Sequence, residues 1–302
     1  MGSVLENLPR ASRVAILRIR SLGDCVLTTP ALDILRRTRP DLRVAVVVED
    51  RFRAIFEDNT DLDDILPPLP MVVRRFRPRL CLNFHGGTRS AWMTAVSGAP
   101  YRAGFGHFRY QFLYNLHIPR AQKILGVERT VHTAEHLASA MFWLGAPVVE
   151  VPRAQLVSGA IGPAGPVAVI HAVGATPEKT WRADGFLAVA NHLRQSGLDV
   201  VFIGAESDDL SPFAEFGVLR GRPLSEIKDL LARASLFVGN DSGPAHMAAA
   251  FGLPVVVIFG ESDPAIWGPW RTASEVIRAQ GGIRNVVVSQ VIAATARLRV
   301  AA

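Results

Sequence analysis

A length of 302 residues is about twice that of a common single domain, so two domains are expected. Hydrophobic residues make up 49% of the chain and charged residues 20%, a mixture that excludes a disordered or collagen-like protein. The net charge of +6 lies entirely in the first half: residues 1–150 hold 20 Lys and Arg against 14 Asp and Glu, and residues 151–302 hold 13 of each. The first half is therefore expected to meet an anionic partner.

Several other classes of protein do not fit the sequence. Cys25 and Cys81 are isolated and form no CxxC pair, which favours free buried thiols in a reducing cytosol over a disulfide framework or a zinc knuckle. No long apolar core precedes Arg10, so a signal peptide is not expected. Residues 154–177 and 242–260 are uncharged, but Gly and Pro interrupt both stretches, so neither is expected to span a membrane.

Apolar runs and helical patterns alternate along the first half. Continuous apolar runs, typical of strands covered on both faces, predict strands at 13–19, 42–48 and 80–84. A helical pattern follows the first strand up to residue 40, and others occupy 88–96 and 131–144. A segment rich in Gly, Pro and Ala at 145–166 then marks the expected domain boundary.

The same alternation restarts after this segment. Strands are predicted at 167–171, 198–204, 236–238 and 255–259, with helices at 184–196, 224–233 and 243–251. Two such series predict an α/β protein with two Rossmann-like, doubly wound domains, 1–155 and 156–302, facing a central cleft. The final helix could pack back on the first domain. Ligand-binding groups should follow the strands, because such folds bind ligands at the carboxyl ends of their strands.

The strongest candidate site runs from Val238 to His246, where a strand feeds a turn and then a helix. Asp241 or Ser242 can cap this helix, and Pro244 suits its first turn. Gly243 lets a ligand approach the backbone, so the free N–H groups at the helix start predict a phosphate site. The alternative is a purely structural helix cap with His246 as a core histidine.

A second candidate, Ser21-Leu22-Gly23-Asp24, follows the first predicted strand. A glycine-containing loop at this position is a usual place for substrate. Asp24 could act as a general base if it faces the cleft. It could also serve only as the cap of the helix that follows.

The loop 171–181 and the end of the strand 198–204 provide further candidates. Lys179, in this loop with Thr176, is one of three lysines against thirty arginines, which fits a point-charge contact to phosphate. Glu206 could accept hydrogen bonds from ribose hydroxyls, as acidic residues at such strand ends do. The alternatives are a solvated lysine and a surface carboxylate.

A basic run lies in the first half, with Phe76 inside it. The run comprises Arg74, Arg75, Arg77 and Arg79, with Arg89 further along the chain. Nucleic acid is one candidate partner, but no recognition-helix, RRM or KH signature accompanies the run. An anionic glycolipid or membrane surface explains it equally well, and a merely solvated run of charge is the third interpretation.

Metal and common nucleotide motifs are missing from the sequence. His132 and His136 have the i, i+4 spacing of zinc ligands, but Glu135 does not complete a HExxH order, so no metal site is predicted. Neither a Walker loop nor GxGxxG occurs, which counts against an ATPase or a dinucleotide-dependent dehydrogenase.

Taken together, these motifs resemble the ADP-heptose:lipopolysaccharide heptosyltransferase family of inverting GT-B glycosyltransferases. The resemblance covers nearly the whole chain and rests on an ordered set of segments at 18–24, 28–32, 83–90, 101–105, 179–181, 239–246 and 254–260. Two departures stand out. Ser242 replaces the threonine often found there, which keeps the hydroxyl, and the region after Trp270 lacks the cysteine-bearing insert of many members.

The resemblance implies a role for each candidate residue. Asp24 would be the catalytic base. The donor site would comprise Thr176, Lys179, Glu206, Asp241, Ser242, Gly243 and His246. The acceptor site would comprise Ser21, Gly23, Arg74, Arg75 and Arg89. No metal and no cofactor is implied, and ADP-heptose would be a substrate.

The implied reaction is inverting transfer of heptose from ADP-heptose to the Kdo-lipid A inner core of lipopolysaccharide. The enzyme would be cytoplasmic, peripheral on the cytoplasmic face of the inner membrane, and would bind no nucleic acid. Two alternatives stay open at this point. One is a transferase for another nucleotide-sugar, and the other is a non-catalytic protein that binds a nucleotide-sugar or nucleic acid.

Overall fold

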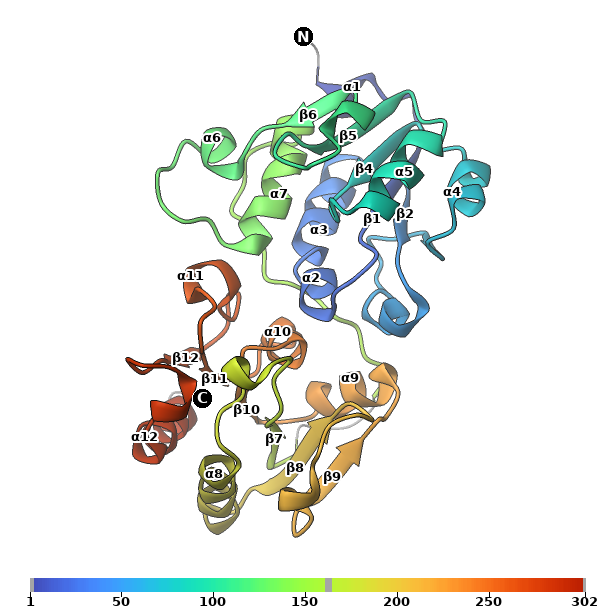
Figure 1. Ribbon diagram of the computed structural model, residues 1–302. Helices are drawn as coiled ribbons and strands as arrows, with labels where there is room; N and C mark the ends of the chain where they lie inside the picture. The colour runs from blue at the N-terminus through green and yellow to red at the C-terminus, as the bar shows by residue number, and fades with distance from the viewer. Residues whose placement is uncertain (1–2, 161–164, 301–302) are drawn as a thin grey trace. The chain divides into compact units, whose positions relative to one another are not determined.

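The computed structural model describes residues 3–160 and 165–300 and divides the chain into two compact units, Met1–Pro152 and Arg153–Ala302 (Figure 1). The expected domain division was placed three residues further along the chain. Each unit has one sheet of six parallel strands with helices on its faces. The predicted doubly wound α/β fold is therefore confirmed for each unit.

The sheet of the first unit has the strand order β3-β2-β1-β4-β5-β6. Its strands are β1 (Arg13–Leu17), β2 (Arg43–Val47), β3 (Asp64–Leu66), β4 (Leu80–Asn83), β5 (Tyr101–Phe105) and β6 (Leu116–Ile118). The order reverses between β1 and β4, so the loops after these two strands border the topological switch point. The three predicted strands correspond to β1, β2 and β4. The other three were not predicted.

The helices of the first unit are α1 (Val4–Asn7), α2 (Leu22–Val26), α3 (Thr29–Thr38), α4 (Pro70–Phe76), α5 (Thr88–Val96), α6 (Ala121–Leu125) and α7 (Thr133–Leu144). Two 3-10 turns are η1 (Asp50–Ile55) and η2 (Gln111–Leu113). The single helix expected after the first strand is divided into α2 and α3, because Pro30 near the start of α3 cannot continue the hydrogen-bond ladder of a preceding helix.

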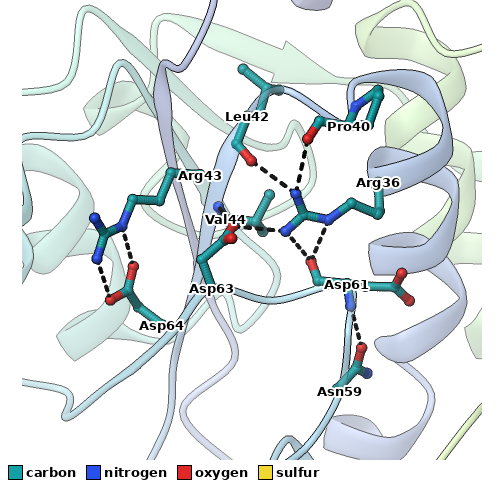
Figure 2. Close-up of polar contacts among 9 residues, drawn as sticks. All are labelled: Arg36, Pro40, Leu42, Arg43, Val44, Asn59, Asp61, Asp63 and Asp64. Carbon is teal, nitrogen blue, oxygen red and sulfur yellow. Dashed lines mark hydrogen bonds and ion pairs between the residues drawn. The ribbon is translucent and has the colours of Figure 1, made fainter.

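Arginine side chains stabilise the amino-terminal edge of the first sheet through hydrogen bonds and ion pairs (Figure 2). The Arg36 guanidinium donates to the carbonyl oxygens of Leu42 and Asp61, each at 3.0 Å, and to Asp63 Oδ2 at 2.7 Å. Arg43, at the start of β2, makes a two-point contact with Asp64, at the start of β3, with distances of 2.7 and 2.9 Å. Part of the basic charge of this unit is thus structural and lies at the edge opposite the switch-point loops.

The sheet of the second unit has the order β12-β11-β10-β7-β8-β9, so its fourth strand again lies beside its first. Its strands are β7 (Val167–His171), β8 (Asp199–Gly204), β9 (Gly217–Arg220), β10 (Leu236–Asn240), β11 (Val255–Ile258) and β12 (Ser274–Ile277). The four predicted strands are confirmed as β7, β8, β10 and β11, while β9 and β12 were not predicted. The second switch point therefore lies between β7 and β10.

The helices of the second unit are α8 (Ala183–Gln195), α9 (Leu224–Ala232), α10 (Gly243–Ala250), α11 (Pro264–Trp267) and α12 (Val288–Val300), with 3-10 turns η3 (Pro177–Lys179), η4 (Ser211–Phe213) and η5 (Ile283–Asn285). The predicted helices correspond to α8, α9 and α10. The last helix, α12, packs against α8, β11 and β12 of its own unit. Its return to the first unit stays a prediction.

Candidate functional site

The motifs singled out in the sequence lie at the carboxyl ends of the switch-point strands. In the first unit, Ser21–Asp24 follows β1, and the loop 84–87 follows β4. In the second unit, the loop with Lys179 follows β7, and Asp241–Gly243 follows β10. Ligands of doubly wound folds bind at these positions. Each unit therefore has a candidate site at its own switch point.

The Asp24 carboxylate is held at both oxygens. Arg18 Nη1 lies 3.4 Å from Oδ1, and the Ser21 hydroxyl donates to Oδ2 at 3.0 Å. The Asp24 side chain is 24% exposed, whereas that of Arg18 is buried. The residue preceding α2 is Ser21, and no side chain caps this helix, so the interpretation of Asp24 as a cap alone is wrong. An oriented, accessible carboxylate has the properties that a general base requires.

The loop after β4 is fixed by a buried residue, Asn83. Its Oδ1 accepts from the backbone N–H groups of His85 at 2.9 Å and Gly86 at 3.0 Å. Its Nδ2 donates to Ser90 Oγ at 3.1 Å and Tyr114 Oη at 2.8 Å. Burial raises the pKa of Tyr114 to about 12, so its hydroxyl stays protonated. No role was predicted for Asn83 from the sequence, although an asparagine that ends a buried apolar strand is a recognisable signal.

Three histidines of this unit have identifiable surroundings. His85 Nδ1 lies 3.1 Å from the Arg20 carbonyl oxygen, and burial together with the Arg18 charge lowers its pKa. His136 stacks on Phe105 with ring centroids 4.0 Å apart, and burial lowers its pKa to about 4. His132 Nδ1 accepts the Ala134 N–H as part of a helix cap. Within residues 3–160 and 165–300, no three potential metal ligands cluster together.

The second unit brings Lys179 and Asp241 together from opposite sides of the switch point. Lys179 Nζ lies 3.2 Å from Asp241 Oδ2, and the lysine side chain is 38% exposed. Ser242 precedes α10 but makes no side-chain cap bond, so the predicted serine cap is wrong. Its buried Oγ has no hydrogen-bond partner among the described residues. A buried hydroxyl without a partner beside an ion pair and a helix N-terminus points to a ligand.

The remaining predicted donor residues lie around this pair. Thr176 precedes η3, and its carbonyl oxygen accepts from the Lys179 N–H at 3.0 Å and from Thr180 Oγ1 at 2.8 Å. Gly243 begins α10, and the side chain of His246, in the first turn of that helix, is buried. Glu206 follows β8, the neighbouring strand of β7. It is exposed and lies 3.5 Å from Arg220. The structure thus brings Asp241, Ser242 and Lys179 together but shows no contact between Glu206 and them.

Gly174 allows the loop after β7 to close. A Cβ atom at this position would lie 2.4 Å from the Lys179 carbonyl oxygen. The Gly174 N–H donates to Thr180 Oγ1 at 3.0 Å. The missing side chain is therefore what permits the tight return of the chain that presents Lys179.

Asn240 in the second unit has the position that Asn83 has in the first, at the end of the fourth strand of its sheet. Its Nδ2 donates to the Ala172 carbonyl oxygen at 2.8 Å, and its Oδ1 accepts from the Trp181 N–H at 3.0 Å. These bonds tie both ends of the Lys179 loop to β10. Asn240 lies within the segment from Val238 to His246 that was predicted to bind phosphate, but no role was predicted for it.

We expect Asn240→Ala to lower the free energy of unfolding by about 2–5 kcal/mol, because it leaves the Trp181 N–H and the Ala172 carbonyl buried without partners. The measurement is denaturant unfolding followed by circular dichroism. The matched control is Asn191→Ala, which removes one local bond on α8 to the Leu187 carbonyl oxygen. Equal stabilities of the two variants would contradict this role for Asn240.

The predicted acceptor arginines fall into two places. Arg89, at the start of α5, donates to the Pro68 carbonyl oxygen at 2.6 Å and lies 3.8 Å from Glu49, which follows β2. It is therefore at the carboxyl edge of the sheet, as Asp24 is. Arg74 and Arg75 lie in the last turn of α4, just before β4 begins, and hence toward the amino edge. The structure does not bring these two to the Asp24 loop.

Comparisons with known proteins agree on one family. The family model of glycosyltransferase family 9 (heptosyltransferase) matches residues 73–290. Lipopolysaccharide heptosyltransferase 3 of Escherichia coli (strain K12) is 26% identical, and the match covers 93% of this chain and 96% of the relative. Lipopolysaccharide heptosyltransferase 1 of the same strain is 23% identical and covers 88% of this chain and 93% of the relative.

Solved structures share the fold. A glycosyl transferase of family 9 from Veillonella parvula DSM 2008 superposes with a TM-score of 0.85 at 21% identity, covering 97% of this chain and 98% of that one. The E. coli heptosyltransferase WaaC, solved with ADP, has a TM-score of 0.79 at 20% identity and covers 94% of this chain and 99% of the other. The predicted GT-B architecture is confirmed by this likeness.

Proposed function

Because the chain belongs to glycosyltransferase family 9, the heptosyltransferases, we propose that it transfers heptose from ADP-heptose to the Kdo-lipid A inner core of lipopolysaccharide, with inversion at the anomeric carbon. The curated relatives are named as lipopolysaccharide heptosyltransferases, and one structural neighbour was solved with ADP. The observation that carries the proposal is the pairing of Lys179 with Asp241 at the start of α10, beside the Ser242 hydroxyl, for which the described residues provide no partner. These groups suit a diphosphate.

The second unit supplies the donor site in this proposal. The Lys179 ammonium and the free N–H groups at the start of α10 would face the oxygens of the diphosphate, on which negative charge develops as the sugar leaves. Asp241 holds the lysine in place, and the Ser242 hydroxyl is free to donate to a phosphate oxygen. We propose that no metal ion is required, because these groups supply the charge stabilisation that a cation would otherwise provide. Glu206, near the end of β8, is proposed to contact the ribose.

The first unit supplies the base. Asp24 would accept the proton of the acceptor hydroxyl as that oxygen attacks the anomeric carbon of heptose. The bond from this carbon to the diphosphate oxygen breaks, and ADP leaves with the electron pair. Because Arg18 and Ser21 fix the two oxygens of Asp24, the carboxylate is oriented before the acceptor arrives. In this proposal the base belongs to the first unit and the groups that bind the donor belong to the second.

The acceptor in this proposal is an anionic glycolipid, so the enzyme would work in the cytoplasm, peripherally on the inner membrane. Of the three predicted acceptor arginines, Arg89 is the one that lies at the same sheet edge as Asp24, so it is proposed to meet the acceptor. Arg74 and Arg75 lie further from that edge and would contact more distant anionic groups of the glycolipid or the membrane.

Thermal-shift screening tests the donor class. ADP-heptose at a concentration of about 100 times its Kd should stabilise the folded protein by about 2.7 kcal/mol, which raises the melting temperature by several degrees. UDP-, GDP- and dTDP-sugars at the same concentration should have little effect. A larger shift with one of these sugars would assign another nucleotide-sugar as donor. Binding of oligonucleotides at physiological salt without any nucleotide-sugar response would support a nucleic-acid binder instead.

A further inference from the structure

One continuous segment carries all the excess positive charge of the first unit. Residues 65–127 contain nine Lys and Arg and no Asp or Glu, whereas the rest of residues 1–150 contains 11 basic and 14 acidic residues. The charge asymmetry of the chain therefore comes from this acid-free segment and not from the first half as a whole. Because this stretch contains no carboxylate side chain, its arginines cannot form ion pairs with one another's neighbours inside it and need partners from elsewhere.

Ion pairing differs inside and outside the segment. Outside it, arginines of the first unit lie within 3.4 Å of a carboxylate at positions Arg18, Arg36, Arg37, Arg39, Arg43, Arg51, Arg53 and Arg129. Inside it, Arg89 approaches Glu49 at 3.8 Å. Among the described residues, no other basic side chain of the acid-free segment makes an ion pair. Its charge is therefore largely without carboxylate partners among the described residues, and exposed arginines such as Arg75 and Arg109 can meet an external anion.

The acid-free segment includes strands β4, β5 and β6 of the first sheet, and the helices that connect them form a layer over one face of that sheet. The connections β4–β5 and β5–β6 run in the same direction across the sheet, so right-handed crossovers place α5 and η2 on the same face. Helix α4 lies beside α5 (Figure 1), with Arg74 Nη1 3.3 Å from the Val96 carbonyl oxygen. On the other side of α5, the Thr88 hydroxyl donates to Tyr110 Oη at 3.1 Å, next to η2. We call α4, α5 and η2 the docking layer.

The docking layer exposes large apolar side chains. Trp92 on α5 is 59% exposed, Phe112 in η2 is 75% exposed, and Met71 and Leu69 at the start of α4 are 57% and 51% exposed. Monomeric soluble proteins rarely gather such side chains on one face without a binding role. Arginines interspersed with tryptophan, phenylalanine and aliphatic side chains are typical of surfaces that lie in the interface of an anionic bilayer.

We propose that the docking layer binds an anionic lipid bilayer, with Trp92, Phe112, Met71 and Leu69 entering the headgroup region and the surrounding arginines contacting lipid phosphates. The biological role of this surface rests on the proposed function, in which the acceptor is a lipid. Arg89 lies at the start of α5, at the sheet edge where Asp24 also lies, so a lipid-linked acceptor would reach Asp24 without leaving the membrane surface.

The composition of the docking layer favours lipid over nucleic acid. Aliphatic side chains such as Leu69 and Met71 offer no surface on which bases stack. Among residues 3–160 and 165–300, no helix has the length and apolar character needed to cross a bilayer, so the contact would be peripheral.

Co-sedimentation of the full-length protein with vesicles tests the docking layer. The vesicles contain equal parts of phosphatidylcholine and phosphatidylglycerol, and pure phosphatidylcholine is the neutral reference. The wild type should bind the anionic vesicles and not the neutral ones. The double variant Trp92→Ser/Phe112→Ser should bind at least about tenfold more weakly, because two aromatic side chains that the bilayer would bury are lost. Arg109 is exposed next to η2 and lies over the Tyr110 ring. Arg109→Gln should weaken binding about fivefold at low salt, and wild type and variant should bind equally at high salt, where the charge is screened.

Matched controls separate this surface from general effects. Val148→Ser removes an exposed apolar side chain outside the docking layer, and Arg10→Gln removes an exposed arginine outside the acid-free segment. Both should bind vesicles as the wild type does, and melting temperatures should confirm that all variants fold. Unchanged binding of Trp92→Ser/Phe112→Ser, equal binding of wild type to neutral vesicles, or binding of an oligonucleotide in place of vesicles would overturn the proposal.

A water-soluble, deacylated acceptor distinguishes this proposal from the proposed function. The double variant should retain wild-type transfer to that acceptor and lose transfer only to the acceptor held in vesicles. If the wild type binds anionic vesicles through these residues but transfers to neither acceptor, the proposed function fails and the docking layer stands. If the double variant loses transfer to both acceptors equally, the layer is part of the acceptor site and the bilayer proposal fails.

Discussion

Asp24→Asn is expected to lower kcat by about 10²–10⁴, the range typical of a lost general base. Asparagine keeps the size and shape of the side chain, and its carbonyl oxygen can still accept the Ser21 hydroxyl, so the loop should stay in place. What the amide cannot do is accept the proton of the acceptor hydroxyl. The measurement is the steady-state rate of ADP release with ADP-heptose and a saturating acceptor.

Two controls test whether the loss of kcat is specific to the chemical step and to Asp24. Donor binding by Asp24→Asn, measured by thermal shift with ADP-heptose, should equal that of the wild type, because the donor groups belong to the second unit. Asp33→Asn removes another carboxylate of the first unit that pairs with an arginine, Arg37, and should leave kcat unchanged. Wild-type turnover by Asp24→Asn would remove Asp24 from the role of base.

Lys179→Met is expected to lower kcat/KM by about 10²–10³, the cost typical of losing one group that stabilises a developing anion. Methionine keeps much of the length of the side chain but brings no charge to the diphosphate. It also leaves Asp241 without its partner, so that the carboxylate repels the donor. Steady-state kinetics with varied ADP-heptose would measure the loss.

A double variant separates the two effects of this change. Lys179→Met/Asp241→Asn removes the repulsive carboxylate together with the lysine, so donor binding should recover in part while kcat stays low. Lys123→Met, an exposed lysine on α6 of the first unit, is the matched control and should behave as the wild type. If Lys179→Met kept full kcat/KM, the charge on the leaving diphosphate would have to be stabilised by other groups.

The buried elements of the fold could be predicted from sequence because of their physical setting. Strands such as β1, β2, β7 and β11 are covered on both faces, so each is a continuous apolar run that stands out from its surroundings. The edge strands β3, β6, β9 and β12 are short and partly exposed, and their mixed composition resembles that of loops. These short strands are stabilised by hydrogen bonds to the neighbouring strand of the sheet. That context leaves no pattern in the local sequence.

The candidate site could be predicted in part. The loops with Asp24, Lys179 and Asp241 were predicted because glycine-containing turns directly follow apolar runs. The roles of Asn83 and Asn240 were missed, because their partners lie far along the chain: Tyr114 is 31 residues from Asn83, and Ala172 is 68 residues from Asn240. The alternative interpretation of Asp24 as a helix cap, and the suggested cap at Ser242, were wrong. In the structure the Asp24 carboxylate contacts Arg18, and the Ser242 hydroxyl has no partner among the described residues.

Product analysis of a single reaction tests the central claim most directly. Purified protein is incubated with ADP-heptose and Kdo-lipid A in anionic vesicles, and the lipid is then analysed by mass spectrometry and by NMR of the new anomeric centre. We predict the addition of one heptose with inverted anomeric configuration and release of one ADP. An unmodified acceptor, in the presence of donor binding and a folded protein, or a product with retained configuration, would contradict the assignment of Asp24 and Lys179 to an inverting transfer.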